Sequence, residues 1–359
     1  MVPTTCIMST LQIGSFRLHV SVICALPPAL CSAYTTPPHY IQLLPSIHNP
    51  SPLQTAPPLY TQLLPEFNFH FGCPRWGKIC DCSAGVGRMD LKGYLHRVGL
   101  STQKPPSLTA LRELHHRHLL SVPFGSLGIH SGERIILDHT LLYDKIVVRR
   151  QDGFCYENNG LFLWVLRESG YQPVVLSARV CNSITGVYGP PYDHMILAVE
   201  LEGQRWLCDV GFGEGIAFPI PLEAGWEGEH PSGVFRLQKA EEEWYLERKE
   251  DGGWRSLYKF RLEEKRFEDF RDMCDYHQMS PSSIFFCKSF CSLLLPRGRA
   301  TYMGCRLIST EYTAGGGTVK STTELTEGEI PRVLRETFGI VLNGKLVPKD
   351  EPIVPPECD

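Results

Sequence analysis

The sequence predicts an α+β fold with more than one domain, and three observations support this prediction. Apolar residues recur at a helical spacing from Leu108 onward, and again after Cys155. Two segments typical of β-strands, 194–201 and 204–211, flank a Glu202-Gly203 turn. The chain has 359 residues, of which 43% are hydrophobic and 21% charged, which is enough for one to three domains with a buried core.

Residues 1–88 differ in composition from the rest of the chain. They hold only six charged side chains but twelve of the 28 prolines. We favour the interpretation that they are a disordered extension or the product of a misplaced start codon. An alternative is a binding segment for a WW-domain protein, because the extension contains two Pro-Pro-x-Tyr motifs. These motifs are Pro37-Pro38-His39-Tyr40 and Pro57-Pro58-Leu59-Tyr60.

Charge and hydropathy exclude several classes of function. A formal net charge of -4 provides no basic field of the kind that attracts nucleic acids. No stretch approaches the roughly 18 apolar residues that a membrane span needs, and Pro27-Pro28 ends the apolar run 18–26 too early for a secretion signal. The eight cysteines after residue 88 suit a reducing compartment. We therefore expect a cytoplasmic protein without nucleic-acid or membrane partners, and we find no spacing typical of a metal site.

The first helical period has clear ends. Ser107 precedes Leu108 as a candidate N-cap, and Val122-Pro123 ends the period. This helix carries His115, His116 and His118. Because no carboxylate or cysteine accompanies them, we expect these histidines on a solvated or half-buried helix surface and not as metal ligands.

Cys155 lies where the second helical period begins. A β-branched stretch at 146–148 precedes it, and Gly170 is the expected end of the helix. At a helix N-terminus the free N–H groups and the macrodipole favour a thiolate, so this position predicts a lowered pKa for Cys155. A single cysteine is more often a small buried hydrophobe. A nucleophile therefore requires a base nearby.

The predicted hairpin supplies a candidate base. If Leu201 lies opposite Gln204, one face of the hairpin is entirely apolar, and His194 and Asp209 share the other face. Diagonal neighbours in a sheet lie about 7–8 Å apart, within reach of a hydrogen bond between these two side chains. Cys155, His194 and Asp209 then form a nucleophile, a base and an orienting group. Cysteine proteases and transglutaminases use the same three roles, so spacing alone leaves the reaction open.

The chain resembles the arylamine N-acetyltransferases from Met89 to about Lys349. The most specific matches are Val122-Pro123-Phe124, Gly153-Phe154-Cys155, Asp193-His194-Met195, Asp209-Val210-Gly211-Phe212-Gly213 and Tyr276-His277-Gln278-Met279-Ser280-Pro281. The resemblance implies a helical domain (89–170), a β-barrel (171–275) and an α/β lid (276–359), with a papain-like Cys-His-Asp arrangement.

The same resemblance implies an acetyl-CoA-dependent enzyme. Its reaction is ping-pong transfer of acetyl through an acetyl-Cys155 thioester to an arylamine, a hydrazine or an N-hydroxyarylamine. Positions that contact the coenzyme in that family correspond to Pro190, Pro191, Tyr276 and Ser282. Positions of the acceptor pocket correspond to Phe124, Val180, Asp193 and Phe212.

Two departures from the family pattern lie close to Cys155. Gln151-Asp152-Gly153 replaces the family's Arg-Gly-Gly, and Gly125-Ser126 replaces its Glu-Asn. The missing Arg and Glu are expected to pair in the family, and losing both partners of a buried pair can be nearly neutral, so we expect a folded protein. A third departure, Glu214, implies an altered acceptor preference. A catalytically impaired homologue that acts as a binding protein is the remaining alternative.

Overall fold

The computed structural model describes residues 10–13, 16–19, 88–183, 185–250, 252–313 and 317–354. The chain divides into two units, Met1–Arg75 and Trp76–Asp359. In the first unit, strands β1 (Thr10–Ile13) and β2 (Phe16–His19) pair antiparallel. Both Pro-Pro-x-Tyr motifs lie outside the described residues.

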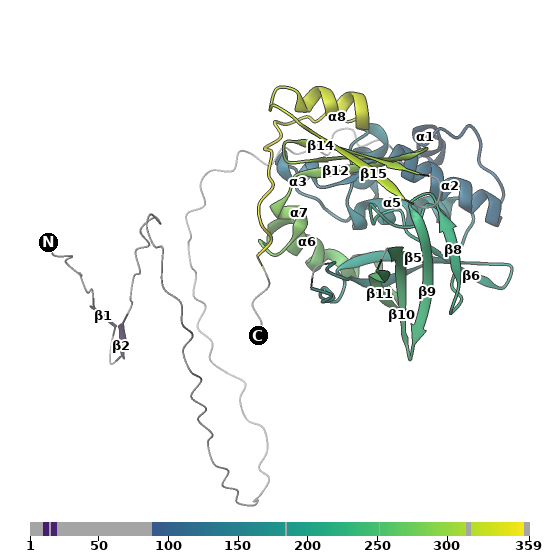
Figure 1. Ribbon diagram of the computed structural model, residues 1–359, viewed down its shortest axis with the longest axis horizontal. Coiled ribbons are helices and arrows are strands. Elements are labelled where there is room, and N and C mark those ends of the chain that lie inside the picture. Colours follow the sequence, from purple (N-terminus) through teal and green to yellow (C-terminus); the bar gives the residue numbers. More distant parts are fainter. Residues whose placement is uncertain are drawn as a thin grey trace, which may run out of the picture. The chain divides into compact units, whose positions relative to one another are not determined.

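The part of the second unit that precedes the first long strand is mainly helical (Figure 1). Its helices are α1 (Leu91–Arg97), α2 (Leu108–Ser121), α3 (Leu127–His130), α4 (His139–Tyr143), the π-helix η1 (Asp144–Val148) and α5 (Cys155–Glu168). Both predicted helices are confirmed. Ser107 Oγ caps α2 by accepting a hydrogen bond from Ala110 N at 3.2 Å. Gly170 ends α5 in the left-handed region, with φ 87°.

An eight-stranded antiparallel sheet occupies the region for which the resemblance implied a β-barrel. Its strand order is β7-β6-β5-β4-β11-β10-β9-β8. The strands are β4 (Pro173–Val180), β5 (His194–Leu201), β6 (Gln204–Cys208), β7 (Ile220–Pro221), β8 (Glu227–His230), β9 (Gly233–Ala240), β10 (Glu243–Glu250) and β11 (Gly253–Lys265).

The β5–β6 hairpin has the predicted register. Leu201 pairs with Gln204, and Leu197 pairs with Cys208. Side chains of β5 alternate between two cores, as the two-residue period of a strand requires. Met195, Leu197 and Val199 join the core that contains α5, whereas Ile196 and Ala198 join the core on the other side of the sheet.

A five-stranded antiparallel sheet completes the second unit. Its order is β15-β14-β13-β12-β3, so β3 (Phe124–Gly125) of the helical segment pairs with a strand from the C-terminal segment. The other strands are β12 (Phe290–Leu295), β13 (Gly298–Met303), β14 (Arg306–Tyr312) and β15 (Thr318–Glu324). Helix α8 (Ile330–Phe338) packs on one face of this sheet through a core that includes Val333 and Tyr302 (Figure 1).

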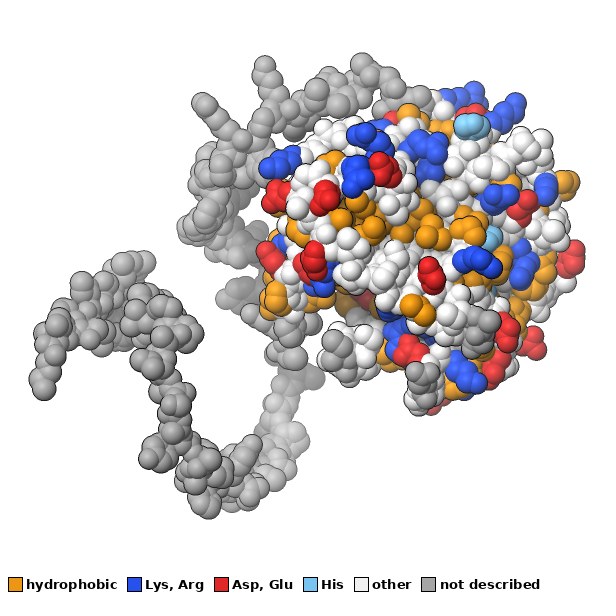
Figure 2. Space-filling model, turned by 45° about the horizontal axis from the view of Figure 1, so that its top comes forward, with side chains coloured by type: hydrophobic (Ala, Val, Ile, Leu, Met, Phe, Trp, Pro, Cys, Tyr) orange, Lys and Arg blue, Asp and Glu red, His pale blue; other side chains and the backbone are white. Residues whose placement is uncertain are grey.

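Three short helices connect the two sheets. They are η2 (Phe267–Phe270), α6 (Arg271–Met279) and α7 (Ile284–Cys287). On the face shown in Figure 2, acidic and basic side chains are interspersed and apolar side chains lie between them. Within the described residues, no helix is both long and apolar enough to cross a bilayer.

Candidate active site

Cys155 is the first residue of α5 and is buried, with a free thiol. Glu157 holds the start of the helix, because its Oε2 accepts a hydrogen bond from Phe154 N at 3.1 Å. The predicted lowering of the Cys155 pKa is wrong for this structure. Burial raises the pKa of the thiol well above its ordinary value, and the nearby carboxylates of Asp193 and Asp209 raise it further. Desolvation therefore outweighs the helix terminus, and the thiol holds its proton until a base removes it.

His194 and Asp209 form the predicted hydrogen bond. His194 Nε2 lies 2.8 Å from Asp209 Oδ2, and both side chains are buried. This contact leaves Nδ1 as the ring nitrogen that can accept another proton. Although burial alone would raise the pKa of Asp209, attraction to His194 and hydrogen bonds from His194, Asn159 and Gly211 N lower it below its ordinary value. Asp209 is thus a carboxylate suited to orienting and stabilising an imidazolium.

Asn159 links the cysteine helix to the hairpin. Its Nδ2 donates to Asp209 Oδ1 at 3.0 Å and to Met195 O at 2.7 Å, and its Oδ1 accepts from Val210 N at 2.9 Å. The sequence interpretation missed this residue. A signal was present, because a polar residue four positions after Cys155 lies on the same face of the helix.

Gly211 allows the chain after Asp209 to pass close to the cysteine. A Cβ at Gly211 would lie 2.8 Å from Cys155 Cα and 2.9 Å from Cys155 O. Any side chain here would force the strand end and the helix apart. The segment after β6 and the first turn of α5 are therefore in direct contact.

His115 supports Asp209 from the side of α2. Its Nε2 accepts a hydrogen bond from Asp209 N at 3.1 Å, and its Nδ1 donates to Ala217 O at 3.3 Å. Burial lowers the pKa of His115 to about 3, so the ring is neutral. We expected the three histidines of this helix on a solvated or half-buried surface, and this holds for the half-buried His116. It is wrong for His115 and His118, which are buried. His118 Nδ1 lies 2.8 Å from Tyr94 OH. Contacts with another element explain this burial, and the helical period alone did not reveal them.

The candidate acceptor residues lie in two pairs. Phe212 contacts the His194 ring with a centroid distance of 5.4 Å, and a Cβ at Gly213 would lie 2.7 Å from the ring of Phe124. The residues after Asp209 therefore place Phe212 against the histidine and approach Phe124, whose ring contacts Phe285 and Phe290. Val180 and Asp193 form the second pair, because Val180 N donates to Asp193 Oδ2 at 3.0 Å.

The candidate coenzyme residues lie on two segments that His277 connects. Pro190 and Pro191 are both exposed before β5, whereas Tyr276 and Ser282 are half-buried in and after α6. His277 is buried; its Nε2 lies 3.3 Å from Asp193 O, and its Nδ1 lies 3.0 Å from Ser283 Oγ. His277 thus ties α6 to the chain directly before His194, a role that the sequence interpretation did not assign.

Comparisons with known proteins identify the family. A family model described as N-acetyltransferase matches residues 107–347. Arylamine N-acetyltransferase 2 of Mesocricetus auratus is 32% identical over 282 residues, which cover 73% of this chain and 97% of the relative. Arylamine N-acetyltransferase 1 of Homo sapiens has the same identity and the same coverage. The chain belongs to the arylamine N-acetyltransferase family.

Solved structures of arylamine N-acetyltransferases show the same α+β fold. The Salmonella typhimurium enzyme has a TM-score of 0.65 and 29% identity, covering 70% of this chain and 90% of its own. The Mycobacterium marinum enzyme in complex with CoA has a TM-score of 0.63 and 30% identity, covering 70% of this chain and 93% of its own. The predicted resemblance and the predicted class of enzyme, an acetyltransferase, are confirmed.

The described residues contain no group of three or more His, Cys, Asp or Glu side chains that could hold a metal ion. The polar groups around Cys155 instead bond to one another. Asp209 makes four of these contacts. Its carboxylate bonds to His194, Asn159 and Gly211 N, and its main-chain N–H donates to His115.

Proposed function

We propose that this chain transfers acetyl from acetyl-CoA to an aromatic amine, hydrazine or N-hydroxyarylamine through an acetyl-Cys155 intermediate. The observation that carries the proposal is the 2.8 Å contact between His194 and Asp209 on a hairpin that continues into Gly211, which packs against Cys155. The family to which the chain belongs and the CoA complex of the M. marinum enzyme support the donor and the acceptor class.

In the first half-reaction, His194 Nδ1 takes the thiol proton as Cys155 Sγ attacks the acetyl carbonyl carbon. The C–S bond to coenzyme A breaks, and the imidazolium returns its proton to the departing thiolate, so that free coenzyme A leaves. The high pKa of the resting thiol is compatible with this step. The carboxylates that oppose an isolated thiolate, Asp193 and Asp209, favour the imidazolium that forms beside it.

In the second half-reaction, the amine nitrogen attacks the thioester carbon and gives its proton to His194. The bond from carbon to Cys155 Sγ then breaks, and the thiolate regains a proton from the imidazolium. We assign Phe124, Val180, Asp193 and Phe212 to the acceptor pocket, because Phe212 contacts the His194 ring, Asp193 precedes His194 and accepts from Val180 N, and Gly213 lies against Phe124. We assign Pro190, Pro191, Tyr276 and Ser282 to coenzyme binding, because His277 ties their two segments together.

We also propose that the chain after residue 88 has three domains. The division into 89–170, 171–275 and 276–359 is supported by the helical segment, the eight-stranded sheet and the five-stranded sheet, although β3 joins the last of these. A cytoplasmic location is supported by the free state of the cysteines in the described residues, which suits a reducing compartment. A WW-domain partner for residues 37–40 and 57–60 stays a prediction.

The test is incubation of the purified full-length chain with acetyl-CoA alone, followed by mass spectrometry of its peptides. We expect one acetyl group on Cys155 and its transfer when an arylamine is added. Cys155→Ala abolishes both results, and Cys274→Ala, which removes another buried thiol, preserves them. Consumption of a glutamine peptide without acetylation would identify a transglutaminase-like or protease-like enzyme. If the wild-type chain carries out neither reaction, it is an impaired homologue and the proposal is refuted.

A further inference from the structure

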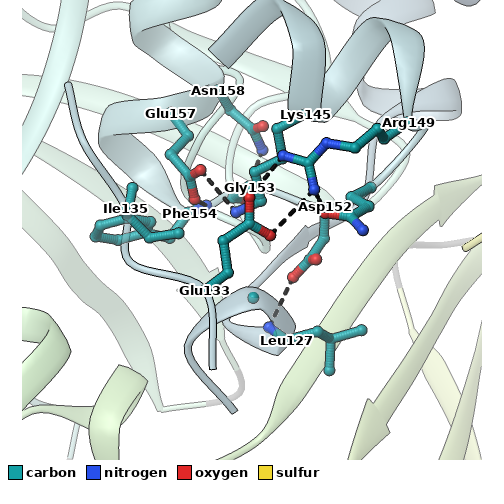
Figure 3. Close-up of polar contacts among 12 residues, drawn as sticks. Leu127, Glu133, Ile135, Lys145, Arg149, Asp152, Gly153, Phe154, Glu157 and Asn158 are labelled. Atoms are coloured by element: carbon teal, nitrogen blue, oxygen red, sulfur yellow. Dashed lines mark hydrogen bonds and ion pairs between the residues drawn. The ribbon is translucent and has the colours of Figure 1, made fainter. Parts of the chain in front are cut away.

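Asp152 is a fully buried carboxyl group three positions before Cys155 (Figure 3). Its Oδ2 accepts a hydrogen bond from Leu127 N, the first residue of α3, at 2.9 Å. Its Oδ1 is also buried, and no described residue donates to it. Buried polar atoms nearly always have a partner, so this half-satisfied carboxyl group requires an explanation.

Gly125 provides the space for the carboxyl group. A Cβ at Gly125 would lie only 2.6 Å from Asp152 Oδ2. The Arg and Glu that are expected to pair in the family are both absent, as the sequence showed. The Asp152 carboxyl group occupies the space beside Gly125 instead and lies close to a buried ion pair.

The buried ion pair joins Lys145 Nζ to Glu157 Oε1 at 2.7 Å, and both side chains are almost completely buried. Among the described residues, Lys145 is therefore a single cation for two buried carboxyl groups. Glu133 forms its own pair with Arg149 at 2.6 Å, and Cys291 is the remaining titratable group in this part of the structure that faces Asp152. If Asp152 and Glu157 were both ionised, the buried cluster would carry an uncompensated negative charge, which is costly.

The charge balance favours one proton on this pair of carboxyl groups. Burial raises the pKa of Asp152, and attraction to Lys145 only partly opposes this shift. Burial likewise raises the pKa of Glu157 to about 7. Such a pair titrates as a unit. Both oxygens of Glu157 already accept, one from Lys145 and one from Phe154 N, whereas Asp152 Oδ1 has no partner among the described residues, so a shared proton is best placed on Asp152.

The loop that contains Asp152 determines where α5 begins. Gly153 N donates to Pro123 O at 3.2 Å, and Gly153 O accepts from Gly125 N at 3.0 Å and from Asn158 Nδ2 at 2.9 Å. These contacts fix the loop to β3 and to α5. The contact with Leu127 is the one that fixes it to α3.

We propose that Asp152 is a positioning residue for Cys155, and that it acts as a neutral hydrogen-bond acceptor for Leu127 N and not as a charge. The proposal rests on the proposed function only in taking Cys155 as the nucleophile. Without this acceptor, Leu127 N is left buried and unpaired, and the loop that leads into Cys155 loses one of its anchors.

The test compares Asp152→Ala, Asp152→Asn and the control Glu133→Gln, which removes a nearby carboxylate that does not contact the loop backbone. Two rates are measured across about pH 5 to 9: formation of acetyl-Cys155 in a single turnover, and alkylation of Cys155 by iodoacetamide. We expect both rates to fall roughly tenfold or more in Asp152→Ala, since a displacement of about 1 Å at a nucleophile can cost ~100-fold. Asp152→Asn, which retains a neutral acceptor, and the control should stay within about threefold of the wild type at neutral pH.

Wild-type rates in a folded Asp152→Ala would overturn the proposal. So would a loss of about tenfold in Asp152→Asn, which would show that the charge is the active property. If Asp152→Ala does not fold, the comparison of wild type with Asp152→Asn still decides. If no variant, including wild type, forms acetyl-Cys155 but alkylation still slows in Asp152→Ala, the proposed function fails and the positioning role stands.

Discussion

Replacing Asn159 by alanine should weaken both the fold and the catalytic machinery. The change leaves Met195 O and Val210 N buried without this partner and removes one donor from Asp209. An unpaired buried main-chain group costs about 1–3 kcal/mol, and a lost hydrogen bond to a carboxylate costs about 1.5–3 kcal/mol. The low end of each range gives a loss of about 3.5 kcal/mol in the free energy of unfolding. A loss of this size is a large fraction of the about 5–15 kcal/mol that stabilises a typical domain.

The effect of Asn159→Ala on catalysis follows from the lost contact with the Asp209 carboxylate. With one donor lost, the Asp209 carboxylate is held less firmly in the position that orients the His194 ring; about 1.5 kcal/mol corresponds to roughly tenfold slower acylation of Cys155. Urea unfolding measures the first effect, and single-turnover acetylation under folded conditions measures the second. The matched control for the stability measurement is Asn158→Ala, since Asn158 is buried on the same helix but contacts Gly153 O and not Asp209. If Asn159→Ala acylates at the wild-type rate, or is destabilised no more than Asn158→Ala, the reasoning is refuted.

Three further changes test other parts of the site. His115→Phe removes the acceptor for Asp209 N, and we expect urea unfolding to show a destabilisation of about 1–3 kcal/mol. The pH profile of acylation should not change, because the His115 ring is already neutral, and a shifted profile would contradict this. Gly211→Ala places a methyl group against the Cys155 main chain, so acetyl-Cys155 formation should be lost, and full activity would disprove the close approach. Glu157→Gln tests the raised pKa of about 7, which belongs to the coupled pair of Asp152 and Glu157, because this variant leaves Lys145 to balance Asp152 alone. A carboxyl group with a raised pKa stabilises the folded state below its unfolded pKa, and that contribution is lost as pH rises toward 7. Wild type should therefore lose more stability than Glu157→Gln between about pH 4.5 and 7. An equal loss of stability in both proteins over this range would contradict the prediction.

The sequence predicted the parts of the site that depend on local pattern. The position of Cys155 follows from a helical period that begins at the cysteine and ends at Gly170. The contact between His194 and Asp209 follows from a two-residue turn and from strict alternation of apolar side chains, because a slip of one residue would expose the apolar face. Both are regularities within fewer than 20 residues of chain.

The sequence did not predict the features that depend on burial or on distant contacts. His115 lies 94 positions from Asp209, and nothing in the helical period of α2 indicates which face will meet the hairpin. The raised pKa of Cys155 likewise depends on contacts with distant segments of the chain. The helix terminus is visible in the sequence, but the desolvation that outweighs it arises only when the sheet covers the helix.

The departures at 125 and 152 show why residues close to a nucleophile need to be interpreted in pairs. Taken separately, the glycine removes an expected side chain, and the aspartate adds an unexpected one. In the structure the two changes are complementary, because the carboxyl group of Asp152 fills the space that Gly125 leaves and bonds to α3. Lys145 and Glu157 already balance one another, so the added group is best accommodated as a neutral acceptor. The region that lacks the family's expected Arg–Glu pair therefore holds a different cluster, which is able to fix the start of α5.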